Sequence, residues 1–379
     1  MAKMKPHHIL LQLGYTTAQR LQGISRFAKE HGWHITLEDR SALPRGWTGD
    51  GALVTIRQNA APLVAYARKL RDGGIPVVDF SIAHPEIRLP RVIGDHAAIG
   101  ALAADHFADR NFRNAVFFSM DYSHVHALRY GGFCRGLRRR VPRWIWREHV
   151  APSRFDDWKR FIAWLSRLLQ DAPKPLAVFA YNDADASRVL NACLQTGLSV
   201  PEEVAVLGVD DDPLICENQF VPLTSIRHDL ERIGYEGAAL LQRLMDGAKP
   251  PKAPIAIPPL GLVVRTSTDT LAADSPLLRH ALFYFREHLS DSFGMTQLAE
   301  ALGASETEIR QAFAEGLDTT PMKELRHRRL ARAKQLLSDT DLTVGEVARQ
   351  TGFCNIAHFS NAFTAAVGHS PLAYRSHIR

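Results

Sequence analysis

The sequence predicts an α/β region with parallel sheets followed by an all-α region, and two observations support this division. As far as about residue 264, short apolar runs rich in β-branched residues alternate with longer helical stretches. Beyond about residue 272 the strand pattern disappears and the periodic stretches are helical. The length agrees, because 379 residues exceed the roughly 250 to 300 at which a single core stops growing.

The first region follows a repeated strand-helix-strand order. Its short runs are almost uniformly apolar, which is typical of parallel strands covered on both faces. The predicted strands are residues 8–13, 33–38, 75–80, 91–95, 114–120, 176–181 and 204–210, and a helix over residues 17–32 joins the first two. This alternation predicts a doubly wound α/β architecture.

Polar side chains follow three of these strands. Asp95 follows one strand, Asn182 follows another, and Asp210 begins an acidic run after a third. Ligands of open α/β sheets bind outside the carboxyl ends of the strands, so these side chains are expected to converge on one crevice. Carboxylates and amides suit a polyol, whose hydroxyls both donate and accept hydrogen bonds. The alternative for each residue taken alone is a helix N-cap.

Composition and motifs exclude several other kinds of site. Hydrophobic residues make up 46% and charged residues 23%, as in ordinary globular proteins. No GxGxxG or GxxxxGK[ST] loop is present, so no nucleotide cofactor is expected. Because no apolar run is long enough for a membrane span or a signal peptide, we expect a cytoplasmic protein without a membrane partner. We expect free thiols and no metal site from the scattered Cys134, Cys193, Cys216 and Cys354.

The net charge of +6 would suit an anionic partner, but the excess does not lie in the helical tail. Residues 275–379 hold 12 Lys and Arg against 11 Asp and Glu. Much of the basic density lies in residues 135–147, RGLRRRVPRWIWR. We interpret that segment as a solvated helix end and loop rather than as a nucleic-acid patch.

The helical tail contains an internal repeat. A short amphipathic helix, MTQLAEAL or TVGEVARQ, ends near Gly303 or Gly352 and is followed by a second helix, ETEIRQAF or IAHFSNAF. This order predicts two helix-turn-helix motifs, each placing its second helix in the major groove of DNA. A connecting helix of 17 residues from Pro321 is about 25 Å long, which suits successive grooves about 34 Å apart. The alternative is an all-helical protein-interaction domain.

Two family resemblances join these observations. The tail resembles the AraC/XylS transcription regulators through TGFCNIAHFSNAFTAAVGHSPLAYR, in which the family pattern is matched by Gly352, Phe353, Phe359, Phe363, Gly368, Pro371 and Tyr374. The first region resembles LacI/GalR-type sugar-sensing domains, through AVFAYNDADASRVLNACLQTGLSVPEEVAVLGVDDD and PLTSIRHDLERIGYEGAALL. The resemblance implies an α/β two-lobed, periplasmic-binding-protein-like sensor over residues 1–271. An all-α, AraC-type DNA-binding domain with two helix-turn-helix motifs would then cover residues 272–379.

The resemblance also implies an effector site. His228 stands where the sensor family often has Gln, and the segment DYSHVHALRY is the part least like the pentose sensors. Tyr15 and Arg20 are expected to contact the effector because they lie at the mouth of the first strand and helix. The full set of expected effector contacts is Tyr15, Arg20, Asp95, Arg129, Asn182, Asp210 and His228.

The DNA-binding residues depart from the family pattern. Four positions that are commonly basic hold the neutral Gln311, Ala314, Asn361 and Thr364. Amides remain suited to adenine, and an arginine suits a guanine edge. Basic residues of the connecting helix, Lys323, Arg326, Arg328, Arg329 and Arg332, are expected to compensate. The candidates for DNA contact are Ser305, Thr307, Arg310, Gln311, Asn355, His358, Asn361 and Arg329.

These observations predict a sugar-responsive, sequence-specific DNA-binding transcription regulator. The resemblance implies an activator of a carbohydrate operon with a pentose-like effector, double-stranded DNA and RNA polymerase as partners, and a homodimer. One alternative is a small-molecule binding protein whose helical tail docks a protein. The other is an enzyme acting on sugars through its aspartates, but no GxSxG, HExxH or phosphate loop supports catalysis.

Overall fold

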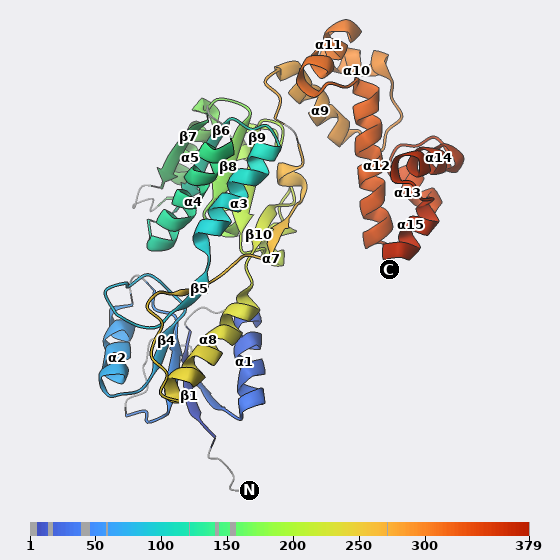
Figure 1. Cartoon of the computed structure of the whole chain (residues 1–379). Helices are drawn as coiled ribbons and strands as arrows, with labels where there is room; N and C mark the ends of the chain where they lie inside the picture. Colours follow the sequence, from blue (N-terminus) through green and yellow to red (C-terminus); the bar gives the residue numbers. More distant parts are fainter. Residues whose placement is uncertain are drawn as a thin grey trace. The chain divides into compact units, whose positions relative to one another are not determined.

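The computed structural model describes residues 6–13, 18–38, 46–57, 60–120, 122–140, 144–151, 157–270 and 272–378. The chain divides into two units, Met1–Asp269 and Thr270–Arg379, and this division lies close to the boundary expected at residue 272. The first unit is α/β and the second is helical in its described part, so the predicted fold classes are confirmed (Figure 1). None of the described helices is long and apolar enough to cross a bilayer.

The first lobe of the α/β unit is built on a parallel sheet with the strand order β2-β1-β3-β4. Its strands are β1 (His8–Gln12), β2 (His34–Leu37), β3 (Gly51–Val54) and β4 (Val77–Asp79), and its helices are α1 (Ala18–His31), α2 (Ala61–Asp72) and α8 (Leu230–Met245). Side chains of β1 alternate between two cores: Ile9 and Leu11 pack with α1 and α8, whereas Leu10 packs with α2.

Helices α1 and α8 lie side by side and approach closely through glycines (Figure 1). A Cβ added to Gly234 would lie 2.2 Å from the backbone oxygen of Arg20, and one added to Gly23 would lie 1.9 Å from that of Glu231. Only glycine permits this approach. The contact fixes the first turn of α1, which carries Arg20.

The second lobe has a six-stranded sheet with the order β12-β10-β9-β8-β6-β7. Its strands are β6 (Asn114–Ser119), β7 (Ile145–Val150), β8 (Leu176–Ala180), β9 (Val204–Val209), β10 (Thr224–Arg227) and β12 (Gly261–Val263). Its helices are α3 (His96–Asp109), α4 (His124–Arg140), α5 (Trp158–Asp171), α6 (Asp183–Thr196) and α7 (Pro213–Cys216). All these strands pair in parallel except β12, which is antiparallel to β10. The central strands β8 and β9 are buried along their whole length, as covered parallel strands must be.

The chain passes between the lobes three times, at residues 94–96, 227–230 and 257–261. Two of these crossings are joined by a small parallel sheet of β5 (Val92–Gly94) and β11 (Ile255–Ile257). The crossings place His96 and His228 at the junction between the lobes. After β12, the short 3₁₀ helix η1 (Thr266–Thr268) ends the unit.

The basic segment 135–147 differs in part from its interpretation. Its first half is the end of α4, where Arg139 pairs with Asp105 at 3.0 Å and Arg140 pairs with Asp109. Its second half was expected to be a loop, but Ile145 begins the edge strand β7, which pairs with β6 over six residues. The basic residues interrupted the apolar run by which sequence reasoning finds a strand.

The helical unit repeats one arrangement about a central helix. Its elements are α9 (Pro276–Glu287), α10 (Met295–Leu302), α11 (Glu306–Leu317), α12 (Pro321–Asp339), α13 (Val344–Gln350), α14 (Ile356–Val367) and α15 (Pro371–Ile378). The first motif, α10 and α11, shares a core with α9 and Leu325 of α12. The second motif, α13 and α14, packs on the other half of α12, against Leu330 and Leu337. Helix α12 therefore belongs to both cores.

The turns of the two motifs use the same backbone conformation. Gly303 has φ +60° and Gly352 has φ +71°, the left-handed conformation that favours glycine. The resemblance between the repeats continues beyond the second helix of each motif. There the backbone is again left-handed, at Asp318 and Gly368, and the next helix begins at Pro321 or Pro371.

Candidate effector site and nucleic-acid interface

A cavity of about 390 Å³ lies between the two lobes of the α/β unit. Its size falls in the range of small-molecule sites, roughly 300 to 1,000 Å³. Five of the expected effector contacts line it together, namely Arg20, Arg129, Asn182, Asp210 and His228. Asp95 is not among the lining residues, and Tyr15 lies outside the described residues.

Arg129, His228 and Asp210 form the polar centre of the cavity. Arg129 is buried, donates through Nη1 to the backbone oxygen of Tyr181, and lies over the Tyr181 ring. Its Nη2 donates to Nε2 of His228 at 2.9 Å and lies 3.9 Å from Oδ1 of Asp210. Because Nε2 of His228 accepts this bond, the imidazole is neutral with its proton on Nδ1. Burial, followed by the nearby Arg129 and Arg20, lowers the pKa of His228 to about 3, which agrees with a neutral ring.

The backbone that presents Asp210 is unusual. Asp210 has φ +114° and Asp211 has φ +52°, and non-glycine residues rarely adopt such values. The Asp210 side chain is 46% exposed but lies within the cavity, where desolvation by the surrounding walls raises its pKa above the ordinary value and the guanidinium groups of Arg129 and Arg20 oppose that shift. Strained backbone persists where the surroundings hold it firmly, and such positions often lie in ligand sites.

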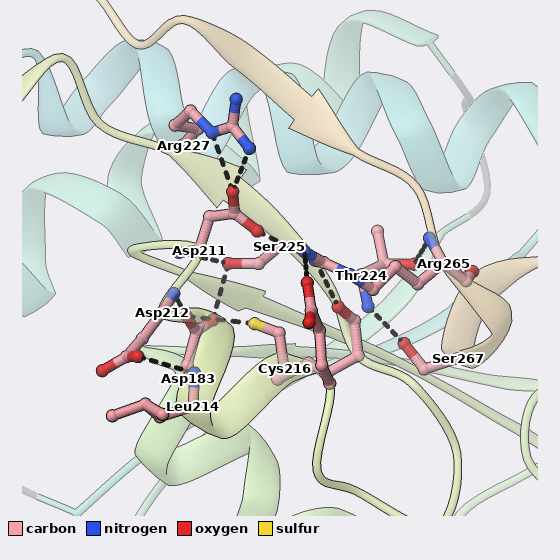
Figure 2. A network of polar contacts seen from close by, with 12 residues as sticks. Asp183, Asp211, Asp212, Leu214, Cys216, Thr224, Ser225, Arg227, Arg265 and Ser267 are labelled. Carbon is pink, nitrogen blue, oxygen red and sulfur yellow. Dashed lines mark hydrogen bonds and ion pairs between the residues drawn. The ribbon is translucent and has the colours of Figure 1, made fainter. Parts of the chain in front are cut away.

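A polar network beneath the cavity supplies that support (Figure 2). Ser225 lies between two aspartates: its Oγ donates to Oδ1 of Asp183 at 2.6 Å and accepts from the backbone N–H of Asp211 at 3.0 Å. Oδ2 of Asp183 accepts from the backbone N–H of Asp212 at 2.9 Å. The loop after β9 is thus tied to the start of α6 and to β10.

The side chain of Asp211 extends the network toward the end of the α/β unit (Figure 2). Nε of Arg227 donates to Oδ2 of Asp211 at 2.7 Å, and Nη1 of Arg265 lies 2.8 Å from Oδ1. Arg265 follows β12 and precedes η1, which is anchored by Ser267: its Oγ donates to the backbone oxygen of Val206 at 2.6 Å. The carboxylate therefore links the loop of Asp210 to the segment that leads into the helical unit.

The wall from the first lobe carries Arg20. Its Nη1 donates to Oγ1 of Thr55 at 3.5 Å, and its guanidinium carbon lies 5.4 Å from the centre of the Phe80 ring. Behind this wall, Asp79 accepts hydrogen bonds from the backbone N–H groups of Ile56 and Ser81 and from Oγ of Ser81. Burial raises the pKa of Asp79 to about 6. Asp79 therefore shapes the wall and does not itself line the cavity.

Asp95 and Asn182 also cap helices, which was the alternative interpretation of the polar residues at the strand ends. Oδ1 of Asp95 accepts from the backbone N–H of Ala98 at 2.9 Å, so this carboxylate caps α3. Asn182 caps α6 through the backbone N–H of Asp185 at 2.8 Å and also lines the cavity. In the structure Asp95 is a helix cap, and Asn182 is both a helix cap and a lining residue.

Sequence reasoning missed several lining residues. Phe80 and Ser81 directly follow β4, so the strand-end rule applied to IPVVDF would have found them. His96 follows Asp95, and burial lowers its pKa well below the ordinary value. Thr55 follows β3, which was not predicted as a strand and so gave no signal.

The second helices of the two motifs expose equivalent faces. On α11, Ile309, Ala312 and Phe313 are buried, and on α14 the buried positions are Phe359, Ala362 and Phe363. The exposed candidates for DNA contact between and beside these buried positions are Thr307, Arg310, Gln311, His358 and Asn361. The exposed Ala314 and Thr364 complete the two faces, which carry little formal charge.

Three candidates make local contacts that organise the second helices. Ser305 and Asn355 are the N-caps of α11 and α14, accepting from the backbone N–H groups of Glu308 and His358. Such caps orient the first turn of each helix. Arg310 pairs with Glu306 at 2.8 Å, a contact that an exposed side chain exchanges readily for another partner.

Arg329 has a structural position rather than a place on the exposed face. Its Nε donates to the backbone oxygen of Leu289 at 3.0 Å, and its Nη2 donates to that of Asp291. The guanidinium also lies over the Phe293 ring and against Gly352. The carbonyl oxygens of the loop after α9 hold this guanidinium against the body of the unit, and a DNA contact from Arg329 stays a prediction.

Two family models match the chain. A periplasmic binding protein-like domain matches residues 104–268, and a helix-turn-helix domain matches residues 298–377. The xylose operon regulatory protein of Escherichia coli K12 is 24% identical over 98% of this chain and 97% of that protein. The protein of the same name from Haemophilus influenzae is 26% identical over 76% of this chain and 74% of its own length.

Solved structures agree with the fold. The structure of the xylose-binding transcription activator xylR has a TM-score of 0.76 at 23% identity and covers 98% of both chains. The complex of the transcriptional regulator CelR with cellobiose has a TM-score of 0.56 at 22% identity and covers 69% of this chain and 84% of that one. At these identities the likeness concerns the fold.

Proposed function

We propose that the chain is a sugar-responsive, DNA-binding transcription regulator that joins a periplasmic-binding-protein-like sensor to an AraC-type helix-turn-helix domain, and that its effector is a small sugar held in the cavity between the lobes. The observation that carries this proposal is the convergence of Arg129, Asn182, Asp210 and His228 on one cavity of suitable size. These groups supply both donors and acceptors for hydroxyls. Pentoses are the first effectors to test, because the relatives regulate xylose operons.

The proposed mechanism is a shift in lobe closure. A sugar that touches both walls binds the closed arrangement more tightly than the open one, and only that difference in affinity shifts the equilibrium. The three crossings between the lobes are the positions where such a movement is absorbed. In this mechanism, a movement of the Asp210 loop is transmitted through the contact between Asp211 and Arg265 to the end of the α/β unit.

On the DNA side, we propose that α11 and α14 enter successive major grooves and read base edges with Gln311 and Asn361. The assembly is proposed to be a homodimer that activates transcription through RNA polymerase. Effector binding then changes how two tails occupy neighbouring half-sites. Since the relatives are transcription regulators, an enzymatic role for the cavity is not favoured, nor is a tail that docks a protein in place of DNA.

A thermal-shift screen tests the effector site. Sugars at about 100 times their dissociation constant stabilise the folded state by roughly 2.7 kcal/mol, which raises Tm by a few degrees. We expect a stabilising sugar for the wild type and a lost response in Asp210→Ala. Asp72→Ala, which removes an exposed carboxylate of α2 paired only locally with Arg71, is the matched control and keeps the response. An equal response in Asp210→Ala would reject this site.

A further inference from the structure

The charges around the cavity are unbalanced. Among the described residues that line it, three are arginines, Arg20, Arg57 and Arg129, and one is a carboxylate, Asp210. A neutral polyol needs hydrogen-bonding groups but no excess of cations. Two of the arginines, Arg20 and Arg129, are close enough to act on the same Asp210 and His228. Their mutual repulsion is offset by a single carboxylate in the lining.

The carboxylates behind the walls restore the balance only in part. Asp79 is turned into the first lobe, where it accepts three hydrogen bonds and lies 3.5 Å from Arg91. Asp95 is occupied as the cap of α3, and Asp183 is occupied in the network with Ser225. Burial raises the pKa of Asp183 to about 7, which reduces the negative charge it holds near neutral pH. Asp79, with its pKa raised to about 6, stays largely ionised there, and its charge acts on Arg20 as well as on Arg91.

Helix dipoles also contribute positive electrostatic potential around the cavity. The first turns of α1, α3, α4 and α8 contribute Arg20, His96, His124 and Leu230 to the lining. The carboxylates of Asp95 and Asp229 cap α3 and α8, so among the described residues it is α1 and α4 whose first turns carry no capping carboxylate. Each N-terminus carries a partial positive charge and favours a negative group. The imidazole of His228 is neutral and adds a hydrogen-bonding group without a compensating negative charge.

We propose that the effector is an acidic monosaccharide, with its carboxylate or phosphate bound by Arg20 and Arg129 and its hydroxyls facing Asp210 and Asn182. A guanidinium matches both kinds of anion through two parallel N–H groups. Among the described residues, Arg20 makes one long hydrogen bond, to Thr55 at 3.5 Å, and its Nε has no partner there. This inference rests on the proposed sugar-sensing function and narrows it from sugars in general to sugar acids and sugar phosphates.

The test compares each sugar with its own acid by isothermal titration calorimetry on the full chain. The pairs are xylose with xylonate, glucose with gluconate and glucuronate, and galactose with galacturonate; xylose 5-phosphate tests the phosphate. We expect an acid or phosphate to bind at least about tenfold more tightly than its neutral parent, the gain typical of a charge-assisted hydrogen bond.

Two arginines on α1 give a matched pair of variants. Arg20→Gln removes a cation of the cavity, and we expect the dissociation constant of the acid to rise by about tenfold to a hundredfold while that of the neutral parent changes little. Arg26→Gln removes the same charge from the same helix, but Arg26 pairs with Glu231 outside the cavity and should leave both constants unchanged. Tm without ligand verifies that each variant folds.

Each outcome has one meaning. Tighter binding of an acid or a phosphate than of its neutral sugar supports the proposal if this preference is lost in Arg20→Gln. The anion that binds more tightly then shows whether the effector is a sugar acid or a sugar phosphate. A neutral sugar that binds as tightly as its acid overturns the inference and leaves the proposed sugar-sensing function standing. Failure of all sugars and acids to bind overturns both. An acid whose binding is unaffected by Arg20→Gln overturns the assignment of the anion to this arginine.

Discussion

Asp183 shows how a single buried residue can govern both the shape of the site and the response of the fold to pH. Its carboxylate accepts from Ser225 and from the backbone of Asp212, and so holds the loop that presents Asp210. Burial raises its pKa to about 7 from the ordinary 3.8. The folded state therefore binds this proton more tightly than the unfolded state, and stability is lost as the pH rises from about 4 to 7.

The predicted effect of Asp183→Asn is a smaller pH dependence of stability. The wild type should lose up to about 1.4 kcal/mol of unfolding free energy per pH unit through this group within that window. Asparagine does not titrate, so the difference in Tm between pH 5 and pH 8 should shrink even though Tm itself falls. Asp79, with a pKa near 6, has the same sign and leaves a residual slope. An unchanged difference in Tm would show that Asp183 does not titrate in this range.

At this scale, sequence reasoning succeeded where a residue follows a recognisable strand. Asn182 and Asp210 follow long apolar runs, and both line the cavity. Thr55 was not found because its strand has four residues and no alternation. The network residues Arg227 and Arg265 were not found either, since their partner Asp211 comes from a different strand end and only the folded sheet joins them.

At the scale of elements, some of the short strands and the most polar strand escaped prediction. The three-residue strand β5 was predicted within residues 91–95, whereas β11, which also has three residues, was not predicted because so few residues show no period. The edge strand β7 contains Arg147 and Glu148 among its apolar residues, because an edge faces water on one side. The helices of the second unit were found readily, since each amphipathic stretch is bounded by a glycine, a proline or a capping residue.

Helix α12 provides the test at this scale, because Arg329 and Arg326 lie on different sides of it. Arg329→Ala removes the donors of the backbone oxygens of Leu289 and Asp291, so we expect a loss of about 1 to 3 kcal/mol in unfolding free energy. Arg326 is exposed, and its removal should change stability by less than about 0.5 kcal/mol. Urea denaturation of both variants measures the difference. Equal stability of the two variants would show that the contacts of Arg329 with these carbonyl oxygens do not stabilise the unit.

At the scale of the whole molecule, the proposed regulation requires the cavity to influence a DNA-binding unit that follows it in the chain. The described structure offers a covalent route from one to the other. The loop of Asp210 continues into Asp211, whose carboxylate pairs with Arg265, and residues 265–269 lead directly into the second unit. A shift of the loop on closure therefore acts on the start of that connection.

Arg265→Ala should uncouple the two units while leaving each one functional. Arg265 does not line the cavity and does not belong to the helical unit, so the affinity for effector and the affinity for DNA without effector should both stay within about threefold of wild type. The change in DNA affinity caused by effector, typically about 5-fold to 150-fold in coupled systems, should fall toward onefold.

The control variant is Arg227→Ala, which removes the other guanidinium from the carboxylate of Asp211 without altering the segment that leads into the helical unit. This variant should retain most of the coupling. Titrations of labelled DNA with and without effector give the two DNA affinities of each variant, and calorimetry gives its affinity for effector. If Arg227→Ala abolishes coupling as completely as Arg265→Ala, the signal depends on the charge of Asp211 being paired and not on its contact with the connecting segment.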